Sequence, residues 1–116
     1  MPETSLVKLI QVALSELGVR LFRNNVGALK DKSGRWVQFG LCPGSSDLVG
    51  WRTITVTPAM VGKKVAIFCA IEVKGKGSKT HPKRLEEQKR FIETVSMAGG
   101  LAMFTDNLNE TIQKFK

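Results

Sequence analysis

The chain has 116 residues, of which 42% are hydrophobic and 24% charged, and its formal net charge is +8. This composition is that of a globular protein and argues against disorder, while the length predicts a single domain, residues 1–116. No apolar run reaches the ~18 residues of a membrane span and the N-terminus lacks a signal-peptide pattern, so we expect a soluble cytoplasmic protein.

The few cysteine and histidine residues exclude two common kinds of site. Cys42 and Cys69 are the two cysteines, and in a cytosolic chain we expect free thiols rather than a disulfide. His81 is the single histidine and lies in a lysine-rich loop, where we expect a loop residue. A Cys/His zinc site and Ser-His-Asp chemistry are therefore both disfavoured.

The first half of the chain predicts a helix followed by strands. Apolar residues recur at helical spacing over residues 4–17, and Gly18 follows as a stop. Residues 19–24 form a short strand candidate, residues 27–40 are typical of a β-hairpin, and residues 47–57 are predicted as a strand interrupted by Pro58.

The second half predicts a strand, a helix, a short strand and a last helix. Residues 64–74 are almost continuously apolar, which indicates a central strand covered on both faces. A helix begins at Pro82 and ends at Gly99-Gly100, a buried strand covers residues 101–104, and Asn107 with Glu110 predicts a capping box. We therefore expect an α/β domain with one mixed central β-sheet flanked by helices.

An acid and a base share one face of the strand at residues 64–74. Because alternate residues of a strand point to opposite faces, Glu72 and Lys74 project side by side at the end of a face that is otherwise apolar. This placement suits catalysis. A solvated Glu/Lys pair at a strand end remains the alternative interpretation, because a Glu-x-Lys tripeptide is common by chance.

A second carboxylate, Asp47, follows a Pro/Gly/Ser loop and opens the strand at residues 47–57. Two carboxylates from neighbouring strand ends, together with an ammonium, can hold a divalent cation and an attacking water, and Mg²⁺ or Mn²⁺ prefers such oxygen ligands. Lys74 would position or deprotonate that water. The alternative for Asp47 is a turn residue that accepts backbone hydrogen bonds.

An ordered set of motifs links these residues to a known family. Gly44-Ser45-Ser46-Asp47-Leu48-Val49-Gly50, then Ala70-Ile71-Glu72-Val73-Lys74, then Gln88 on the next helix resemble the virus-type replication-repair nuclease (VRR-NUC) domain of stand-alone phage or bacterial type. That domain belongs to the PD-(D/E)xK nuclease superfamily, so the resemblance implies a restriction-endonuclease-like core. Ser46 rather than proline precedes the Asp here.

The resemblance also implies a role for each site residue. Asp47 and Glu72 would bind the metal together with the backbone carbonyl of Val73, and Lys74 would be the catalytic lysine. Gln88 would support the site, although a buried backbone carbonyl is another partner for its amide. Glu3 would hold a metal-bound water or a second ion; a carboxylate that favours the helix N-terminus is the equal alternative.

The basic residues indicate a polyanionic partner, and seven of them lie between Lys74 and Arg90. The residues expected to contact the DNA backbone are Lys76, Lys79, Lys83 and Arg84, with Arg23, Asn24 and Asn25. Trp36 and Trp51 are candidates for base stacking, but a strand tryptophan is more often part of the core, and we expect the core role.

These expectations combine into an Mg²⁺- or Mn²⁺-dependent DNA endonuclease. Stand-alone relatives resemble resolvases of four-way junctions that act as homodimers, and the apolar residues Ile54, Val56, Met60 and Val61 would supply the two-fold interface. For a phage protein the compartment would be the host cytoplasm. The alternatives are a non-catalytic nucleic-acid-binding module on the same fold and a basic interaction protein in which the Glu-x-Lys is coincidental.

Overall fold

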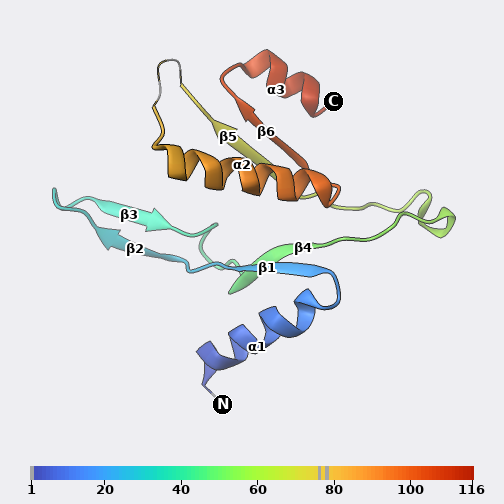
Figure 1. The fold of residues 1–116 in the computed structure, drawn as a ribbon. Coiled ribbons are helices and arrows are strands. Elements are labelled where there is room, and N and C mark those ends of the chain that lie inside the picture. The colour runs from blue at the N-terminus through green and yellow to red at the C-terminus, as the bar shows by residue number, and fades with distance from the viewer. Residues whose placement is uncertain (1, 76, 78) are drawn as a thin grey trace. The chain divides into compact units, whose positions relative to one another are not determined.

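Along the described residues, one helix and four short strands are followed by a second half in which strands and helices alternate (Figure 1). The computed structural model describes residues 2–75, 77 and 79–116. It divides into an N-terminal unit, Met1–Thr55, and a C-terminal unit, Val56–Lys116, each of which is described by itself. None of the helices in the described ranges is both long and apolar enough to cross a membrane.

The N-terminal unit is a helix followed by an antiparallel strand pair. α1 (Glu3–Ser15) contacts β1 (Val19–Arg23), and β1 pairs with β4 (Leu48–Arg52) in the register that sets Val19 against Arg52 and Arg23 against Leu48. The turn between helix and strand uses Gly18 at φ 78°, a left-handed conformation that favours glycine. Gly50 is needed for another reason, since a Cβ there would overlap the Arg20 carbonyl oxygen across the ladder.

A hairpin is inserted between β1 and β4. β2 (Gly27–Lys30) and β3 (Trp36–Phe39) pair antiparallel, as the sequence predicted, and the turn contains Gly34 at φ 86°. Every residue of β3 is exposed, and Trp36 retains 68% of its accessible surface. The expected core role of Trp36 is therefore wrong, whereas Trp51 is half-buried and packs its ring 5.6 Å from that of Phe22.

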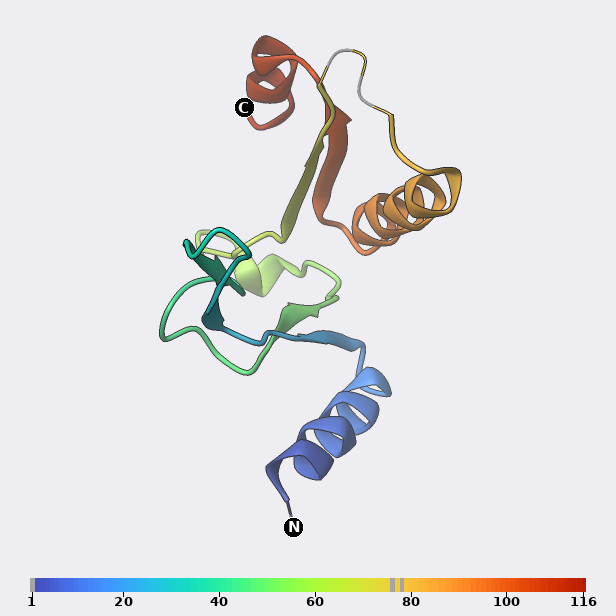
Figure 2. The same cartoon turned by 90° about the vertical axis from the view of Figure 1, so that its left-hand side faces the viewer.

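The C-terminal unit is built on a parallel strand pair joined by a helix. β5 (Cys69–Val73) and β6 (Leu101–Thr105) are linked through α2 (Pro82–Met97), and the short 3₁₀ helix η1 (Pro58–Met60) precedes them. Val95 of α2 and Ala102 of β6 are buried between helix and strands. Figure 2 shows α2 and α3 (Leu108–Lys114) on opposite sides of the strand pair.

The last helix begins close to the predicted place. The Asn107 side chain accepts a 3.0 Å hydrogen bond from the Glu110 backbone N–H, which is one half of the expected capping box. The other half is replaced, because the Asn107 backbone N–H donates to Oγ1 of Thr105.

Two expectations about strands are wrong. The strand predicted over residues 64–74 is limited to Cys69–Val73, because its partner β6 begins only at Leu101, after Gly100. The strand predicted over residues 47–57 is likewise shorter, at Leu48–Arg52. In the described part of the chain the strands form three two-stranded ladders, and the single mixed central sheet stays a prediction. The α/β class is confirmed, and β5 has one exposed face instead of two covered ones.

Candidate active site

Glu72 and Lys74 lie on one face of the β5 strand end, as the alternation of side chains predicted. Ala70, Glu72 and Lys74 are half-buried on the side that faces α2, whereas Cys69 and Ile71 are exposed on the other. The exposed fraction is 24% for the Lys74 side chain and 35% for that of Glu72. Both charged groups are thus shielded from solvent without being removed from it.

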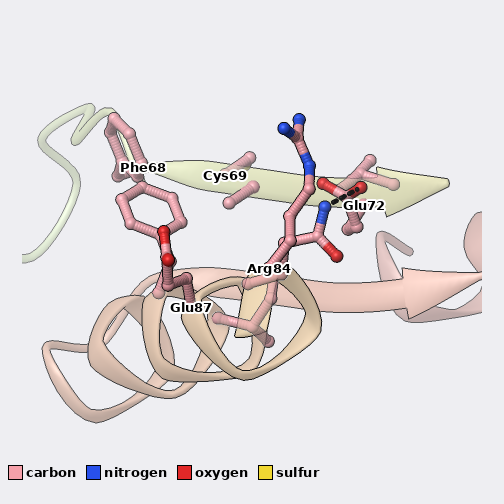
Figure 3. A pocket seen from close by; sticks show the side chains of 10 residues that line it. Phe68, Cys69, Glu72, Arg84 and Glu87 are labelled. Atoms are coloured by element: carbon pink, nitrogen blue, oxygen red, sulfur yellow. Dashed lines mark hydrogen bonds between the residues drawn. The ribbon is translucent and has the colours of Figure 1, made fainter. Parts of the chain in front are cut away.

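Gln88 connects the two charged side chains. Its Oε1 accepts a 2.7 Å hydrogen bond from Nζ of Lys74, and its Nε2 donates a 2.9 Å hydrogen bond to Oε1 of Glu72. The second bond is the dashed line beside Glu72 in Figure 3. Gln88 lies three residues after Leu85, on the half-buried side of α2. A polar side chain in this position needs hydrogen-bond partners, and Lys74 and Glu72 provide them.

The ammonium group of Lys74 has three oxygen acceptors around it. Besides Gln88, Nζ donates to Oγ1 of Thr80 at 2.8 Å and lies 3.4 Å from Oε1 of Glu72. An ammonium has three N–H donors, so these acceptors match its capacity and fix the side chain in one position. Sequence reasoning missed Thr80; the only signal was a hydroxyl residue directly before the helix start at His81-Pro82.

Two oxygen atoms beside this network could serve as ligands for a hard cation. Both recorded contacts of Glu72 use Oε1, which leaves Oε2 with no hydrogen bond or ion pair to another described residue. The Lys74 N–H donates to the Thr105 carbonyl on β6, and the Val73 carbonyl belongs to the same trans peptide. That carbonyl therefore points away from β6. A carboxylate oxygen and a backbone carbonyl are ligands that Mg²⁺ or Mn²⁺ accepts.

Asp47 lies in the N-terminal unit, exposed, directly before β4. Its backbone carbonyl accepts a 2.8 Å hydrogen bond from the Asn24 N–H, which extends the β1–β4 ladder by one bond. Within the described ranges no three His, Cys, Asp or Glu side chains gather in a group that would hold a metal ion. The helix α1 begins at Glu3, whose side chain falls outside what the structure describes.

Asn24 has a structural task rather than the exposed position expected of a DNA contact. It is only 8% exposed, and its Nδ2 donates to Oγ of Ser45 and to the Ser46 carbonyl. Its Oδ1 accepts from the Leu41 N–H at 3.0 Å. Because its amide groups are used within the protein, Asn24 holds the loop that precedes Asp47, and we remove it from the predicted DNA surface.

The remaining residues predicted to contact DNA are divided between the two units. Lys79, Lys83 and Arg84 are exposed around the beginning of α2, and Lys76 lies outside the described residues. In the N-terminal unit, Arg23 and Asn25 are exposed and joined by a 3.0 Å hydrogen bond from Arg23 Nε. His81 caps α2, since its Nδ1 accepts from the Lys83 N–H.

A pocket of about 550 Å³ opens beside Glu72 and Gln88. Figure 3 shows Arg84 and Glu87 reaching toward it from α2, opposite Phe68 and Cys69. The pocket is lined by Phe68, Cys69, Ala70, Ile71, Glu72, Arg84, Glu87, Gln88, Phe91 and Ile92. The guanidinium of Arg84 thus lines the same pocket as the carboxylate of Glu72, where it can meet a phosphate group.

Comparison with protein families matches this chain to the VRR-NUC domain over residues 2–105. The chain belongs to the VRR-NUC domain family. The match spans both units and contains every residue of the predicted site from Glu3 to Gln88. Membership implies a nuclease-type function with a nucleic-acid substrate. Searches of curated proteins and of solved structures found no match.

Proposed function

We propose that this VRR-NUC protein is an Mg²⁺- or Mn²⁺-dependent endodeoxyribonuclease. The observation that carries the proposal is the Glu72–Gln88–Lys74 network, in which a neutral amide holds a carboxylate and an ammonium side by side. A Glu/Lys pair in a simple surface salt bridge needs no third residue. Here the network leaves Oε2 of Glu72 and the Val73 carbonyl available for a ligand.

The proposed metal site draws its ligands from both halves of the chain. Glu72, the Val73 carbonyl and Asp47 would hold the ion, with Glu3 on a bound water or a second ion. A bound Mg²⁺ or Mn²⁺ supplies Lewis-acid polarisation of the phosphate and a more acidic water. The proposal requires Asp47 and Glu72 to share that ion and residues 1–116 to act as one nuclease domain. The family match across both units supports this requirement.

The chain's own residues then position the reactants. Lys74, held by Gln88 and Thr80, directs its positive charge toward the scissile phosphate, where negative charge grows as the water oxygen bonds to phosphorus and the bond to the leaving sugar oxygen breaks. Arg84, Lys83 and Lys79 bind the phosphates on either side. Because these are backbone contacts, the enzyme would select DNA by shape rather than by sequence.

We further propose that the protein acts as a homodimer and resolves four-way DNA junctions. A two-fold dimer offers two active sites to a substrate with paired scissile strands. Val56 and Val61 are highly exposed, and Ile54 is partly so, which supports an apolar contact between copies. Size-exclusion chromatography with light scattering tests it, and a monomer at micromolar concentration contradicts it.

Cleavage of labelled DNA in Mg²⁺, Mn²⁺ and EDTA tests the nuclease proposal. We expect metal-dependent cleavage that is lost in Asp47→Asn, Glu72→Gln and Lys74→Ala. The matched controls are Asp106→Asn, Glu86→Gln and Lys89→Ala, which change exposed residues of the same types and should cleave as the wild type does. Binding without cleavage in every metal would instead support a non-catalytic module. Equal cutting of linear duplex and four-way junction would remove the junction preference alone.

A further inference from the structure

The β2–β3 hairpin has two different faces. Residues that pair directly across an antiparallel ladder lie on the same face, so the register places Leu29 with Val37 and Gly27 with Phe39 on an apolar face. The other face carries Lys30 opposite Trp36, and Ala28 opposite Gln38. A two-stranded hairpin is marginal by itself in water, so an exposed one gains from a binding partner.

The face with Lys30 and Trp36 has the chemistry of a nucleic-acid contact. The indole of Trp36 is 68% exposed, and Nζ of Lys30 lies 5.3 Å from its ring centroid. This cation–π contact keeps an ammonium and an aromatic surface together. Lys32 and Arg35 are also exposed at the turn that joins Lys30 to Trp36, so the turn end of the hairpin carries three cations and one exposed tryptophan. Cations that bind phosphates, next to a ring that stacks on a base, are the usual combination for binding nucleic acid with unpaired bases.

The single acid of the hairpin, Asp31, is engaged in the turn. Oδ1 of Asp31 accepts hydrogen bonds from the Ser33 N–H at 2.9 Å, the Ser33 hydroxyl at 2.7 Å and the Arg35 N–H at 2.9 Å. That oxygen faces inward, toward the turn. The turn is thereby fixed, and the cationic side chains remain exposed around it.

The base of the hairpin is fixed beside Asp47. Asn24, three residues before β2, donates its backbone N–H to the Asp47 carbonyl, and its Oδ1 accepts a hydrogen bond from the N–H of Leu41, two residues after β3. Gly40 packs so closely on Val26 that a Cβ there would lie 2.7 Å from the Val26 Cα. Both ends of the hairpin are therefore held at the end of the β1–β4 ladder where the predicted metal ligand lies.

We propose that the β2–β3 hairpin is a DNA-binding arm, in which Lys30, Lys32 and Arg35 bind backbone phosphates and Trp36 stacks on an unpaired base. The inference rests on the proposed function for its substrate. It adds a second contact region, separate from the cations of α2, and it favours DNA that has unpaired bases near a branch. The base of the arm is held next to Asp47, and the proposed contact residues lie at its turn end.

Fluorescence anisotropy with labelled DNA tests the arm in a full-length Glu72→Gln background, where the substrate stays intact. We expect Trp36→Ala to weaken binding to splayed-arm DNA about tenfold and to change blunt-duplex binding less. The triple change Lys30→Gln, Lys32→Gln, Arg35→Gln should weaken binding to both DNAs. It should also reduce the slope of log affinity against log salt concentration by the equivalent of about two to three phosphate contacts. Lys63→Gln with Lys64→Gln, two exposed lysines outside the arm, is the matched control.

A spectroscopic readout keeps the test independent of affinity. Trp51→Phe leaves Trp36 as the single tryptophan, and its fluorescence should be quenched when splayed-arm DNA binds. Unchanged affinity and salt dependence in the triple variant, together with unquenched Trp36 fluorescence, would overturn the inference. A Trp36→Ala protein that loses dimerisation but keeps its DNA affinity would overturn it too, by assigning this face to a protein contact.

Failure of the arm and failure of the nuclease proposal give different results. If only the arm is wrong, the wild type cleaves DNA in Mg²⁺ and the hairpin variants bind as tightly as the background protein. If only the nuclease proposal is wrong, no metal supports cleavage while the hairpin variants still lose affinity. Circular dichroism of each variant, compared with the background protein, shows that a lost affinity does not come from unfolding.

Discussion

Lys74 donates a 2.7 Å hydrogen bond from Nζ to Oε1 of Gln88, and this bond determines which way the amide faces. An ammonium only donates, so it must meet the amide oxygen. The amide nitrogen is then turned toward the carboxylate of Glu72, which only accepts when ionised. Gln88 is thereby a positioning residue whose orientation follows from the charges on both sides.

Replacing Gln88 should reduce cleavage without reducing DNA affinity. Gln88→Leu removes both hydrogen bonds, and Gln88→Glu places a second carboxylate against Oε1 of Glu72. Loss of a residue that orients a metal ligand typically lowers activity about 10–100-fold, and we expect that range for both variants. Single-turnover cleavage at saturating DNA measures it. Gln113→Leu, on the exposed side of α3, is the control, and a Gln88→Leu enzyme with wild-type rates would contradict the assignment.

Thr80 should affect the rate of cleavage through its hydroxyl alone. Thr80→Val keeps the shape but removes the acceptor 2.8 Å from Lys74 Nζ. A hydrogen bond to a charged group contributes about 1.5–3 kcal/mol, so we expect kcat to fall about tenfold or more with KM unchanged. Thr80→Ser should restore the rate because it returns the hydroxyl. Equal loss in the serine and valine variants would show that the methyl group matters instead. Thr57→Val is the control, because the Thr57 side chain makes no capping hydrogen bond to η1.

The local features of the fold could be predicted because they depend on short-range rules. The shared face of Glu72 and Lys74 follows from the two-residue period of a strand, and the hairpin follows from its turn residues. The Asn107 cap was predicted from its spacing to Glu110, and the structure confirms its first half. Such patterns are fixed by neighbours in the chain.

The features that failed depend on partners distant in the sequence. The length of β5 is set by where β6 begins, after Gly100, and nothing within residues 64–68 indicates that limit. Trp36 has the composition of a core residue, yet its place in a protruding hairpin leaves it exposed. The burial of Asn24 likewise comes from Ser45 and Ser46, more than twenty residues away.

The hairpin turn should depend on the ionisation of Asp31. The hydrogen bond from the Ser33 side chain, followed by the backbone hydrogen bond from Arg35, lowers the pKa of Asp31 below its ordinary value of 3.8. Because the folded pKa is lower than the unfolded one, the stabilisation is complete above the unfolded pKa and is lost as the pH falls through the folded pKa. NMR titration of the Asp31 carboxyl should give this lowered midpoint, accompanied by changes in the β2–β3 amides.

A single substitution checks the cause of the Asp31 shift. Ser33→Ala removes the largest contribution and keeps the Ser33 N–H, so the midpoint of Asp31 should move up toward the ordinary value. If the Ser33→Ala and wild-type midpoints coincide, the hydroxyl is not the cause. At neutral pH both proteins have an ionised Asp31, so their affinities for splayed-arm DNA should agree, which separates turn chemistry from the proposed contact at Trp36.

Asn24 should contribute to stability rather than to DNA affinity directly. Asn24→Ala leaves the Leu41 N–H and the Ser46 carbonyl without the partners that they have now, in a position only 8% exposed. With each lost hydrogen bond contributing about 0.5–1.5 kcal/mol and unsatisfied groups adding to this, we expect the free energy of unfolding to fall by about 2–4 kcal/mol. Urea denaturation followed by tryptophan fluorescence measures the change.

The neighbouring residue provides the comparison for Asn24. Asn25 is exposed, and its Oδ1 accepts a hydrogen bond from the Arg23 guanidinium, so Asn25→Ala should change the free energy of unfolding by less than about 0.5 kcal/mol. The two variants also decide between the roles that sequence and structure assign. An Asn24→Ala protein as stable as the wild type but weaker in DNA binding would return Asn24 to the DNA surface. If Asn24→Ala is destabilised but its folded fraction binds DNA normally, the Asn24 amide holds the loop that precedes Asp47.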